Sequence, residues 1–260
     1  MKILISNDDG IYSPGIKFLK KEMSLIAETI VIAPDRNCSG YSNALTLTKP
    51  LKINKLKNNY YSVTGTPVDC VHLGLTGLIN KKFDIVISGI NDQPNLGDDI
   101  LYSGTIAAAM EGRYLKLPAI SLSISKNKND NIYYYNVAAI IARQLVTNLY
   151  KNIFPPKTIL NINVPNIPLN KIKGIKISRL GTRHYPKSLI KDYDPRGNKI
   201  YWIGLPGLKS DTGPGTDFYA IKNNYISITP INTNLTNYRI FNELKIWINS
   251  IHIEYDIIKN

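Results

Sequence analysis

The sequence predicts a doubly wound α/β protein, in which helices cover both faces of a largely parallel sheet and form three α/β/α layers. Two observations lead to this expectation. Short apolar runs typical of buried strands alternate with helix patterns along most of the 260 residues. The first strand–helix–strand unit takes about 30 residues, a length typical of parallel strands joined by a crossover helix. We therefore expect a Rossmann-like fold in one domain over residues 1–260.

The first unit begins at the second residue. Lys2–Ser6 is a short apolar run bounded by turn residues and predicts a buried strand. Ser13 followed by Pro14 is typical of a helix start, and the apolar positions of one helical face follow at Ile16, Leu19, Met23 and Ile26. Thr29–Ala33 predicts a second buried strand, parallel to the first and reached by a right-handed crossover.

The middle of the chain continues the alternation. Strand-like runs occupy 45–54 and 59–64. The segment Thr66-Pro67-Val68-Asp69 has the pattern of a capping box and opens a helix that we expect to reach Leu78. Phe83–Ser88 then predicts another buried strand.

The second half supplies the remaining elements. We expect a helix near 105–115, a strand at 118–124, a helix at 133–149, and strands at 158–164 and 225–231. The strands of the C-terminal part are expected to run antiparallel to the others.

Residues 181–217 have a different composition from the rest. Pro and Gly pairs interrupt short strand-like pieces, and the stretch is too long for a plain connection. It predicts a protruding arm that docks on another subunit. Beyond it, an amphipathic helix is expected at about 233–250, with its apolar face at Leu235, Tyr238, Phe241, Leu244, Ile248 and the adjoining Ile251.

Composition narrows the class of protein. Lys and Arg number 32 against 19 for Asp and Glu, which gives a formal charge of +13. The basic residues are scattered without an Arg-rich stripe, so they favour attraction of anionic substrates over specific nucleic-acid binding. No apolar run approaches a membrane span, no signal-peptide pattern opens the chain, and Cys38 and Cys70 form no CxxC pair. We expect a cytoplasmic protein that does not contact the membrane.

Three polar loops follow predicted strands, at Asn7–Gly10, Asp35–Asn43 and Gly89–Gly104. Asn-Asp-Asp-Gly alone is more typical of a solvated turn than of a site. In an open parallel sheet, however, ligands bind beyond the carboxyl ends of the strands, where these loops meet. Their oxygen donors suit one divalent cation, magnesium or manganese, with the predicted ligands Asp8, Asp9, Ser39 and Asn91.

A phosphate site is expected at the start of the helix near residue 105. Ser103-Gly104-Thr105 combines free backbone N–H groups with the positive end of the helix dipole, although the same residues also fit simple N-capping. Asn95 is a further candidate for holding phosphate oxygens. His184 is a candidate outer contact to substrate.

The chain resembles the SurE survival-protein nucleotidases over nearly its whole length. The matching segments, in order, are SNDDGIYSPGI, APDRNCSGYSNALT, GTPVDCVHLG, SGINDQPNLGDDILYSGTIAAAMEG, LNINVP, GTRH, DPRGN, YWIG, GPGTDF and YISITP. The family's metal ligands fall on Asp8, Asp9, Ser39 and Asn91. Two positions depart from the family pattern: Gln93 stands where Gly is usual, and Cys38 where a basic or polar residue is frequent.

The resemblance implies a metal-dependent phosphatase of nucleoside 5′- and 3′-monophosphates that also shortens short-chain polyphosphate. It also implies a homodimer or homotetramer formed by exchange of C-terminal elements. Asp8 would orient or deprotonate the attacking water. Two alternatives stay open: Asp8 as a covalent nucleophile, and a non-catalytic nucleotide- or RNA-binding protein whose acidic loop is structural.

Overall fold

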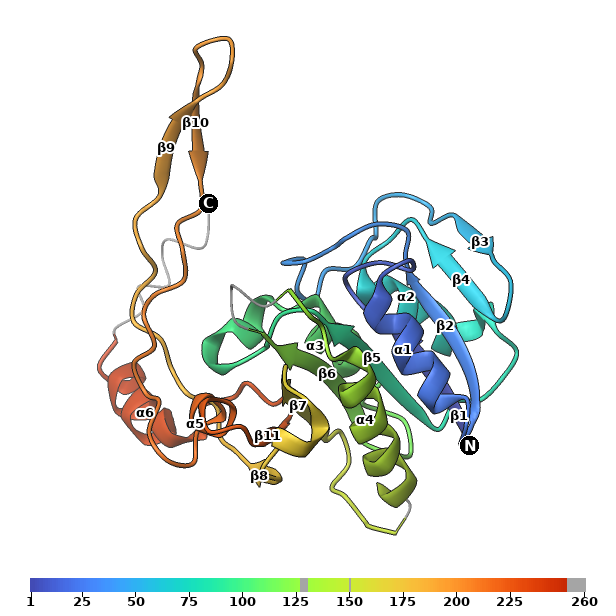
Figure 1. Cartoon of the computed structure of the whole chain (residues 1–260). Coiled ribbons are helices and arrows are strands. Elements are labelled where there is room, and N and C mark those ends of the chain that lie inside the picture. Colours follow the sequence, from blue (N-terminus) through green and yellow to red (C-terminus); the bar gives the residue numbers. More distant parts are fainter. Residues whose placement is uncertain (127–130, 150, 252–260) are drawn as a thin grey trace.

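A nine-stranded mixed sheet forms the centre of the chain in the computed structural model, which describes residues 1–126, 131–149 and 151–251 (Figure 1). The strand order is β3-β4-β2-β1-β5-β6-β7-β11-β8. Its strands are β1 (Lys2–Ser6), β2 (Glu28–Pro34), β3 (Ile53–Lys55), β4 (Tyr60–Val63), β5 (Ile85–Asn91), β6 (Ala119–Ser125), β7 (Ile159–Pro165), β8 (Ile175–Ile177) and β11 (Ile226–Ile231).

Most neighbouring strands are parallel, as the sequence predicts. The β3–β4 and β7–β11 pairs are antiparallel, and β8 runs parallel to β11. The direction therefore changes at one edge and in the C-terminal part of the sheet. Together with the helices on both faces, this arrangement confirms the three-layer α/β/α expectation.

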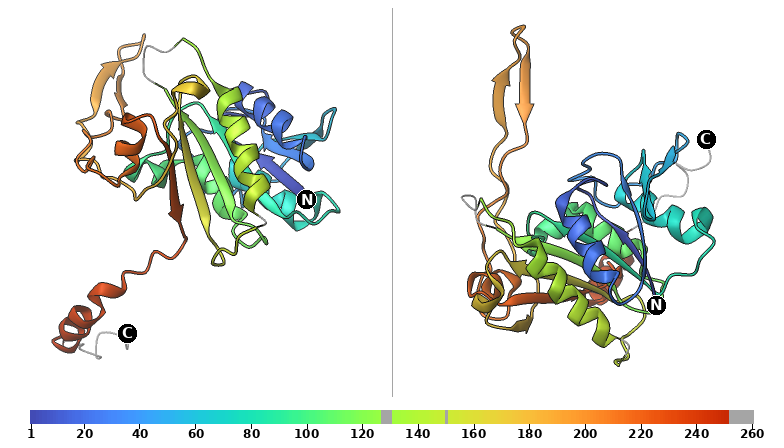
Figure 2. Two further views of the ribbon diagram at one scale, coloured as in Figure 1. Left: turned by 60° about the horizontal axis from the view of Figure 1, so that its bottom comes forward. Right: turned by 45° about the vertical axis from the view of Figure 1, so that its right-hand side comes forward.

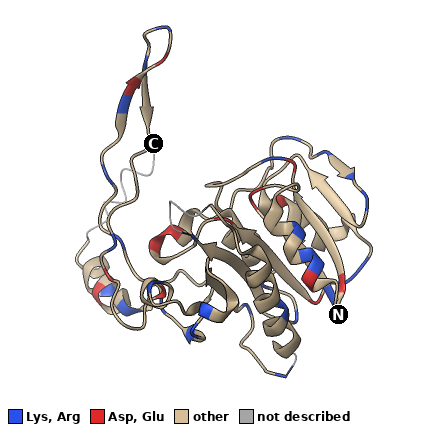
Figure 3. Cartoon of the chain, in the orientation of Figure 1, with Lys and Arg blue, Asp and Glu red and all other residues tan. Residues whose placement is uncertain are grey.

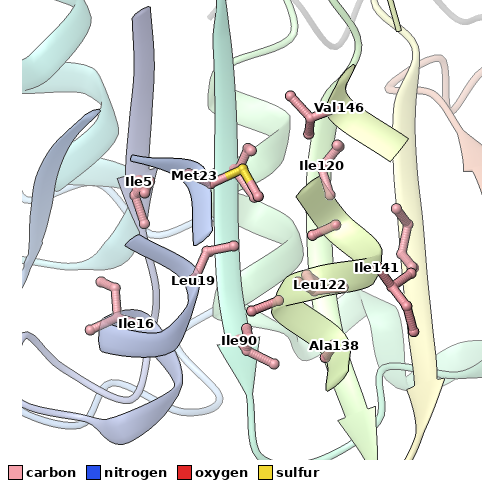
Figure 4. Packing of buried hydrophobic residues seen from close by; sticks show 14 of the residues in the cluster. Ile5, Ile16, Leu19, Met23, Ile90, Ile120, Leu122, Ala138, Ile141 and Val146 are labelled. Carbon is pink, nitrogen blue, oxygen red and sulfur yellow. The ribbon is translucent and has the colours of Figure 1, made fainter. Parts of the chain in front are cut away.

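The helices divide into two layers. Helices α1 (Pro14–Met23) and α4 (Tyr135–Leu149) pack together on one face, and α2 (Pro67–Leu73) and α3 (Gly104–Glu111) pack together on the other. Figure 4 shows Leu19 of α1 and Ile141 of α4 over the same side of the sheet. Each such apolar side chain contributes about 1.5–3 kcal/mol when fully buried.

One crossover has the less common hand. The β5–α3–β6 and β6–α4–β7 connections step in the same direction across the sheet, but α3 and α4 lie on opposite faces. Their hands are therefore opposite. The β1–α1–β2 unit has the same hand as β5–α3–β6, so β6–α4–β7 is the exception to the right-handed rule.

The predicted capping box is present. The Thr66 hydroxyl accepts from the Asp69 N–H at 3.1 Å, and the Asp69 carboxylate accepts from the Thr66 N–H at 2.9 Å. The same carboxylate also accepts from the N–H of Thr46 at 2.9 Å. The Thr46 N–H is therefore not available to pair with a neighbouring strand. The predicted strand at 45–54 is wrong for most of its length, and β3 covers only Ile53–Lys55.

Some element boundaries also differ from the prediction. Ile26 lies beyond the end of α1 but still packs against the core. Helix α3 ends at Glu111, short of the predicted 115, and Gly112 is its C-cap. Only glycine fits at this position, because a Cβ there would be 2.5 Å from the Val86 Cβ. The sequence pattern does not predict strand β8 or helix α5 (Asp217–Lys222). Both are too short to show a hydrophobic periodicity.

The segment after Arg179 leaves the body as a narrow hairpin (Figure 1). Its strands β9 (Ile190–Tyr193) and β10 (Lys199–Trp202) pair antiparallel in a sheet of their own. The two stems below them run side by side, because Arg183 pairs with Lys209 and the His184 N–H bonds the Leu208 carbonyl at 2.8 Å.

The terminal helix is shorter than predicted. A single 3-10 turn, Tyr238–Ile240, precedes α6 (Phe241–Asn249), whereas the expected helix begins at 233. Between these points, Asn side chains bond the backbone two residues on, as Asn232 does with Asn234 at 3.0 Å and Asn234 with Thr236 at 3.1 Å. These bonds compete with helix formation. Figure 2 shows α6 at the end of an extended segment that leads away from the rest of the molecule.

Candidate active site

The three polar loops lie side by side at the carboxyl edge of the sheet. They leave β1, β2 and β5, and β1 lies between the other two. The Cys38 N–H bonds the Asp8 carbonyl at 2.7 Å, which ties the second loop to the first. The Thr105 hydroxyl bonds the Asp8 carboxylate at 2.5 Å, which ties in the helix after the third loop. From β1 the chain continues to β2 on one side of the sheet, and from β5 it continues to β6 on the other side. Such a point between two parallel strands is where α/β folds bind ligands.

The first loop is a tight turn braced from inside. The buried Asn7 amide donates to the Gly10 carbonyl at 3.0 Å and to the Ser13 hydroxyl at 2.7 Å. Ser13 therefore accepts from Asn7 and does not cap α1 with its side chain. Gly10 has φ +96°, and a Cβ there would lie 3.0 Å from the Arg36 carbonyl oxygen. The turn thus requires glycine and fixes the acids that precede it.

Asp8 and Asp9 are not solvated turn residues. Asp8 is 4% exposed, and burial raises the pKa of its carboxyl despite the hydrogen bond from Thr105. Burial, followed by the charges of Asp8 and Asp92, raises the pKa of Asp9 to about 7. Asp92, which the sequence reasoning did not select, brings a third negative charge from the loop after β5. Asp8 is buried, and Asp9 and Asp92 are half-buried. No Lys or Arg is among the groups that shift the pKa of Asp8 or Asp9.

The start of α3 lies directly against Asp8. A Cβ on Gly104 would be 2.8 Å from the Asp8 Cβ, so only glycine permits this approach. Thr105 is fully buried and directs its hydroxyl at Asp8. The Ser103 hydroxyl accepts from the Ile106 N–H at 3.1 Å and caps the helix. Both hydroxyls of the predicted phosphate site thus have partners within the protein.

The other two predicted ligands flank the acids. Ser39 is exposed and follows Cys38, whose N–H holds the Asp8 carbonyl. Asn91, at the end of β5, donates its amide N–H to the Gln93 carbonyl at 2.7 Å. Its Oδ1 accepts no hydrogen bond from the residues that the structure describes and can face a cation. Gln93 does not have a left-handed backbone, so its replacement of a family glycine carries no conformational cost.

Asn95 is held by a polar ladder that the sequence reasoning missed. Its N–H bonds Asn163 Oδ1 at 2.9 Å, its side-chain amide bonds the Ser123 hydroxyl at 2.8 Å, and its carbonyl accepts from both Asn161 and Asn163. Ser123 on β6 and the two Asn residues on β7 are polar positions that alternate with apolar ones along their strands. Asn95 therefore anchors the third loop to the sheet, with its side chain 6% exposed.

His184 is not brought to the three loops by any contact among the described residues. It is exposed on the arm, where its N–H bonds Leu208. Its neighbour Arg183 does reach the third loop, through the carboxylate of Asp99.

The oxygen donors at the edge suit a hard cation. Within residues 1–126, 131–149 and 151–251, no three His, Cys, Asp or Glu side chains gather as a ready metal-binding group. The set at the loops combines two carboxylates with a hydroxyl and an amide oxygen, the chemistry that magnesium and manganese accept. Beneath it, the Asn7 Oδ1 and the Ser6 and Ser88 hydroxyls are buried without hydrogen-bond partners among the described residues.

Comparisons with known proteins agree on one family. The model of the family "Survival protein SurE" matches residues 3–187. A 5′-nucleotidase SurE of Legionella pneumophila (strain Lens) is 58% identical over 254 residues, which cover 98% of this chain and 100% of the relative. A 5′-nucleotidase SurE of Coxiella burnetii is 48% identical over 253 residues, 97% of each chain.

The fold agrees as well. The crystal structure of the SurE protein from Aquifex aeolicus superposes with a TM-score of 0.83 at 41% identity, over 95% of this chain and 100% of that one. The match in sequence runs through the acidic turn, and the match in structure runs through the sheet that carries it. On both grounds, the chain belongs to the SurE family of survival proteins.

Proposed function

We propose that this chain is a metal-dependent 5′-nucleotidase that converts a nucleoside 5′-monophosphate into the nucleoside and phosphate. One observation carries the proposal: Asp8 and Asp9 are held together, largely out of water, at the carboxyl end of β1. The relatives named above bear the name 5′-nucleotidase and span the whole chain.

The acids fit a bound cation on physical grounds. Burial raises the pKa of both carboxyls, the charge of Asp92 adds to both shifts, and the charge of Asp8 adds to that of Asp9. Ionising the two acids together is therefore costly without a positive charge nearby. A divalent cation held by Asp8, Asp9, Ser39 and Asn91 would offset that cost. When bound, it supplies Lewis-acid chemistry that polarises a phosphoryl oxygen and acidifies a neighbouring water.

The protein side chains then have distinct roles. Asp8, fixed by the Thr105 hydroxyl, orients the attacking water and accepts its proton. The backbone N–H of Gly104 at the start of α3 lies beside Asp8 and would hold a phosphate oxygen. Thr105 acts through Asp8, and Asn95 keeps the loop of Asn91 in position.

The test is a phosphate-release screen. We expect turnover of nucleoside 5′-monophosphates with magnesium or manganese and its loss on addition of EDTA, with recovery when the metal is restored. Equal rates with and without chelator would refute the metal dependence. Nucleoside 3′-monophosphates and tripolyphosphate belong in the same screen, because we propose that both are also substrates.

We also propose that the chain forms a dimer or tetramer by exchanging C-terminal elements. All nine residues of α6 are exposed, Phe241 and Trp247 among them, and Trp202 on the hairpin is 60% exposed. Apolar surface of this kind is typical of an interface. Replacing residues 188–204 by a short Gly-Ser turn should yield smaller species by light scattering. An unchanged mass, or a wild-type monomer at micromolar concentration, would refute the exchange.

The remaining expectations concern location and partners. We propose a cytoplasmic enzyme, since Cys38 and Cys70 are both buried free thiols. Among the described residues, every helix is too short or too polar to cross a bilayer. Lys and Arg are spread over the body, the arm and α6 (Figure 3), a distribution that favours no specific nucleic-acid partner.

A further inference from the structure

A second charged feature lies farther along the same edge of the sheet. A cavity of about 820 Å³ opens beyond the ends of β6 and β7, where Ser125 and Pro165 line it. Gln93 and Pro94, between the candidate ligand Asn91 and the anchor Asn95, form another wall. The cavity and the acidic turn thus share the third loop but lie on different strands.

Two cations face this cavity over one aromatic ring. The Arg183 guanidinium carbon lies 5.3 Å from the centre of the Phe218 ring, and the Lys209 Nζ lies 4.9 Å from it. Both distances fall within cation–π range. Phe218 is 3% exposed and packs so closely on Gly97 and Gly181 that a Cβ on either would lie less than 3 Å from the ring. The floor under the two cations is therefore rigid.

The acids around the cavity already have partners. Asp99 accepts from Arg183 with both oxygens, at 2.9 Å and 2.6 Å. The fully buried Asp217 accepts from the N–H groups of Gly97, Gly181 and Phe218 at 2.7–2.9 Å. The oxygens of both carboxylates thus accept hydrogen bonds from these groups, and neither carboxylate forms an ion pair with a lysine among the described residues.

Lys209 is left without a counter-ion. Its Nζ makes no hydrogen bond or ion pair with any described residue, and Lys222 adds a like charge from α5 on the cavity wall. Burial, followed by the charge of Arg183, lowers the pKa of Lys209, although Asp217 and Asp99 act in the other direction. The two nearby carboxylates, Asp99 and Asp217, act on Lys209 only through their charge, because their hydrogen bonds go to other groups. Lys126, the fourth cation on the wall, contacts the Tyr133 ring.

We propose that this cavity is a second anion-binding site, which holds a phosphate group between Lys209 and Arg183 above Phe218. Arg183 presents a guanidinium fixed by Asp99, and Lys209 supplies a mobile ammonium. The phosphate has two sources: a second phosphate on the substrate itself, which rests on the proposed function, or a free anion that binds independently.

The binding test uses metal-free protein. Without a cation, Asp8 and Asp9 repel anions, so binding of inorganic pyrophosphate in EDTA reports on the basic cavity. By titration calorimetry, Lys209→Ala should weaken pyrophosphate binding about 10-fold or more, and Lys209→Arg should keep most of it. Lys191→Ala, an exposed lysine on β9 outside the cavity, is the matched control and should bind as the wild type does. No binding by wild type, or equal binding by Lys209→Ala, would overturn the proposal.

Kinetics then separate the two sources. If the substrate supplies the phosphate, Lys209→Ala raises KM for a nucleoside 3′,5′-bisphosphate about 10-fold and leaves that for the 5′-monophosphate unchanged. If a free anion supplies it, sulfate changes 5′-monophosphate turnover in wild type and not in Lys209→Ala.

A protein that binds pyrophosphate through Lys209 yet hydrolyses no nucleotide would refute the proposed function and leave the anion site standing. If Lys209→Ala changes neither the kinetics in either assay nor pyrophosphate binding, the proposed anion site is refuted.

Discussion

The acidic turn and the basic cavity occupy the same edge of one sheet, but they crowd charges of opposite sign. Asp8 and Asp9 come from adjacent positions on one turn, and Asp92 adds its charge from the next loop. Arg183, Lys209 and Lys222 come from the arm stems and α5. In both places, desolvation and like charge oppose ionisation, although Lys209 and Lys222 are exposed residues. The acidic turn therefore favours a cation, and the basic cavity favours an anion.

The difference lies in how rigidly each group is held. Asp8 accepts a hydrogen bond from Thr105 and is pressed against Gly104, so the carboxylate has one position. Lys209 rests over Phe218 without a hydrogen bond to any described residue. A rigid carboxylate suits a reacting centre, where geometry must be fixed before the reaction. A mobile ammonium suits binding, because it adapts to the anion.

Neutralising Asp8 should give the largest effect. Asp8→Asn keeps the side-chain shape but can neither accept a proton nor carry the charge that a cation requires. We expect kcat for a nucleoside 5′-monophosphate to fall roughly 10³-fold, about 4 kcal/mol in the barrier. Asp35→Asn, which alters a half-buried acid paired with Arg36 on the neighbouring loop, should keep near-normal turnover. Normal turnover in Asp8→Asn would show that this carboxylate is not needed.

Asp217 connects the two regions and should give the next largest effect. Its carboxylate accepts from the third loop at Gly97, from the arm stem at Gly181 and from α5 at Phe218. In Asp217→Asn, one oxygen becomes an NH₂ group facing buried donors, which should lower the free energy of unfolding by about 3 kcal/mol. Urea denaturation measures this change.

The exposed Asp192 on β9 provides the control for that measurement. Asp192→Asn should change stability by less than about 0.5 kcal/mol. If Asp217→Asn were as stable as Asp192→Asn, the three backbone bonds would not couple the cavity to the third loop.

The two regions also differ in how far the sequence predicts them. The acidic turn can be predicted from the sequence because its residues are consecutive and follow an apolar strand. The fold class can be predicted from the alternation of strand and helix patterns. The cation pair over Phe218 is not readable, because Asp99, Arg183 and Lys209 are far apart in the chain and meet through tertiary contacts. Asn161 and Asn163 were missed for a related reason: inside TILNINV they look like interruptions of a strand, whereas they bind the Asn95 backbone.

The smallest expected effect is the pH dependence of stability in the metal-free protein. Burial and the charges of Asp8 and Asp92 raise the pKa of Asp9 to about 7, against about 4 in an unfolded chain. Between these values the folded protein binds a proton that the unfolded chain has released. The free energy of unfolding therefore falls as pH rises from about 4 to about 7. A bound cation reverses the preference, since it favours the ionised carboxylates.

Thermal melts in EDTA at pH 5.5, 6.5 and 8 measure this slope. We expect Tm to drop on the order of a few degrees toward pH 8, and magnesium to raise Tm more at pH 8 than at pH 5.5. Asp9→Asn should flatten the slope, because the amide does not titrate. In Lys209→Ala the slope should persist, because that charge belongs to the basic cavity. A wild-type Tm that is constant across this range would contradict the raised pKa and, with it, the contrast between the two charged regions.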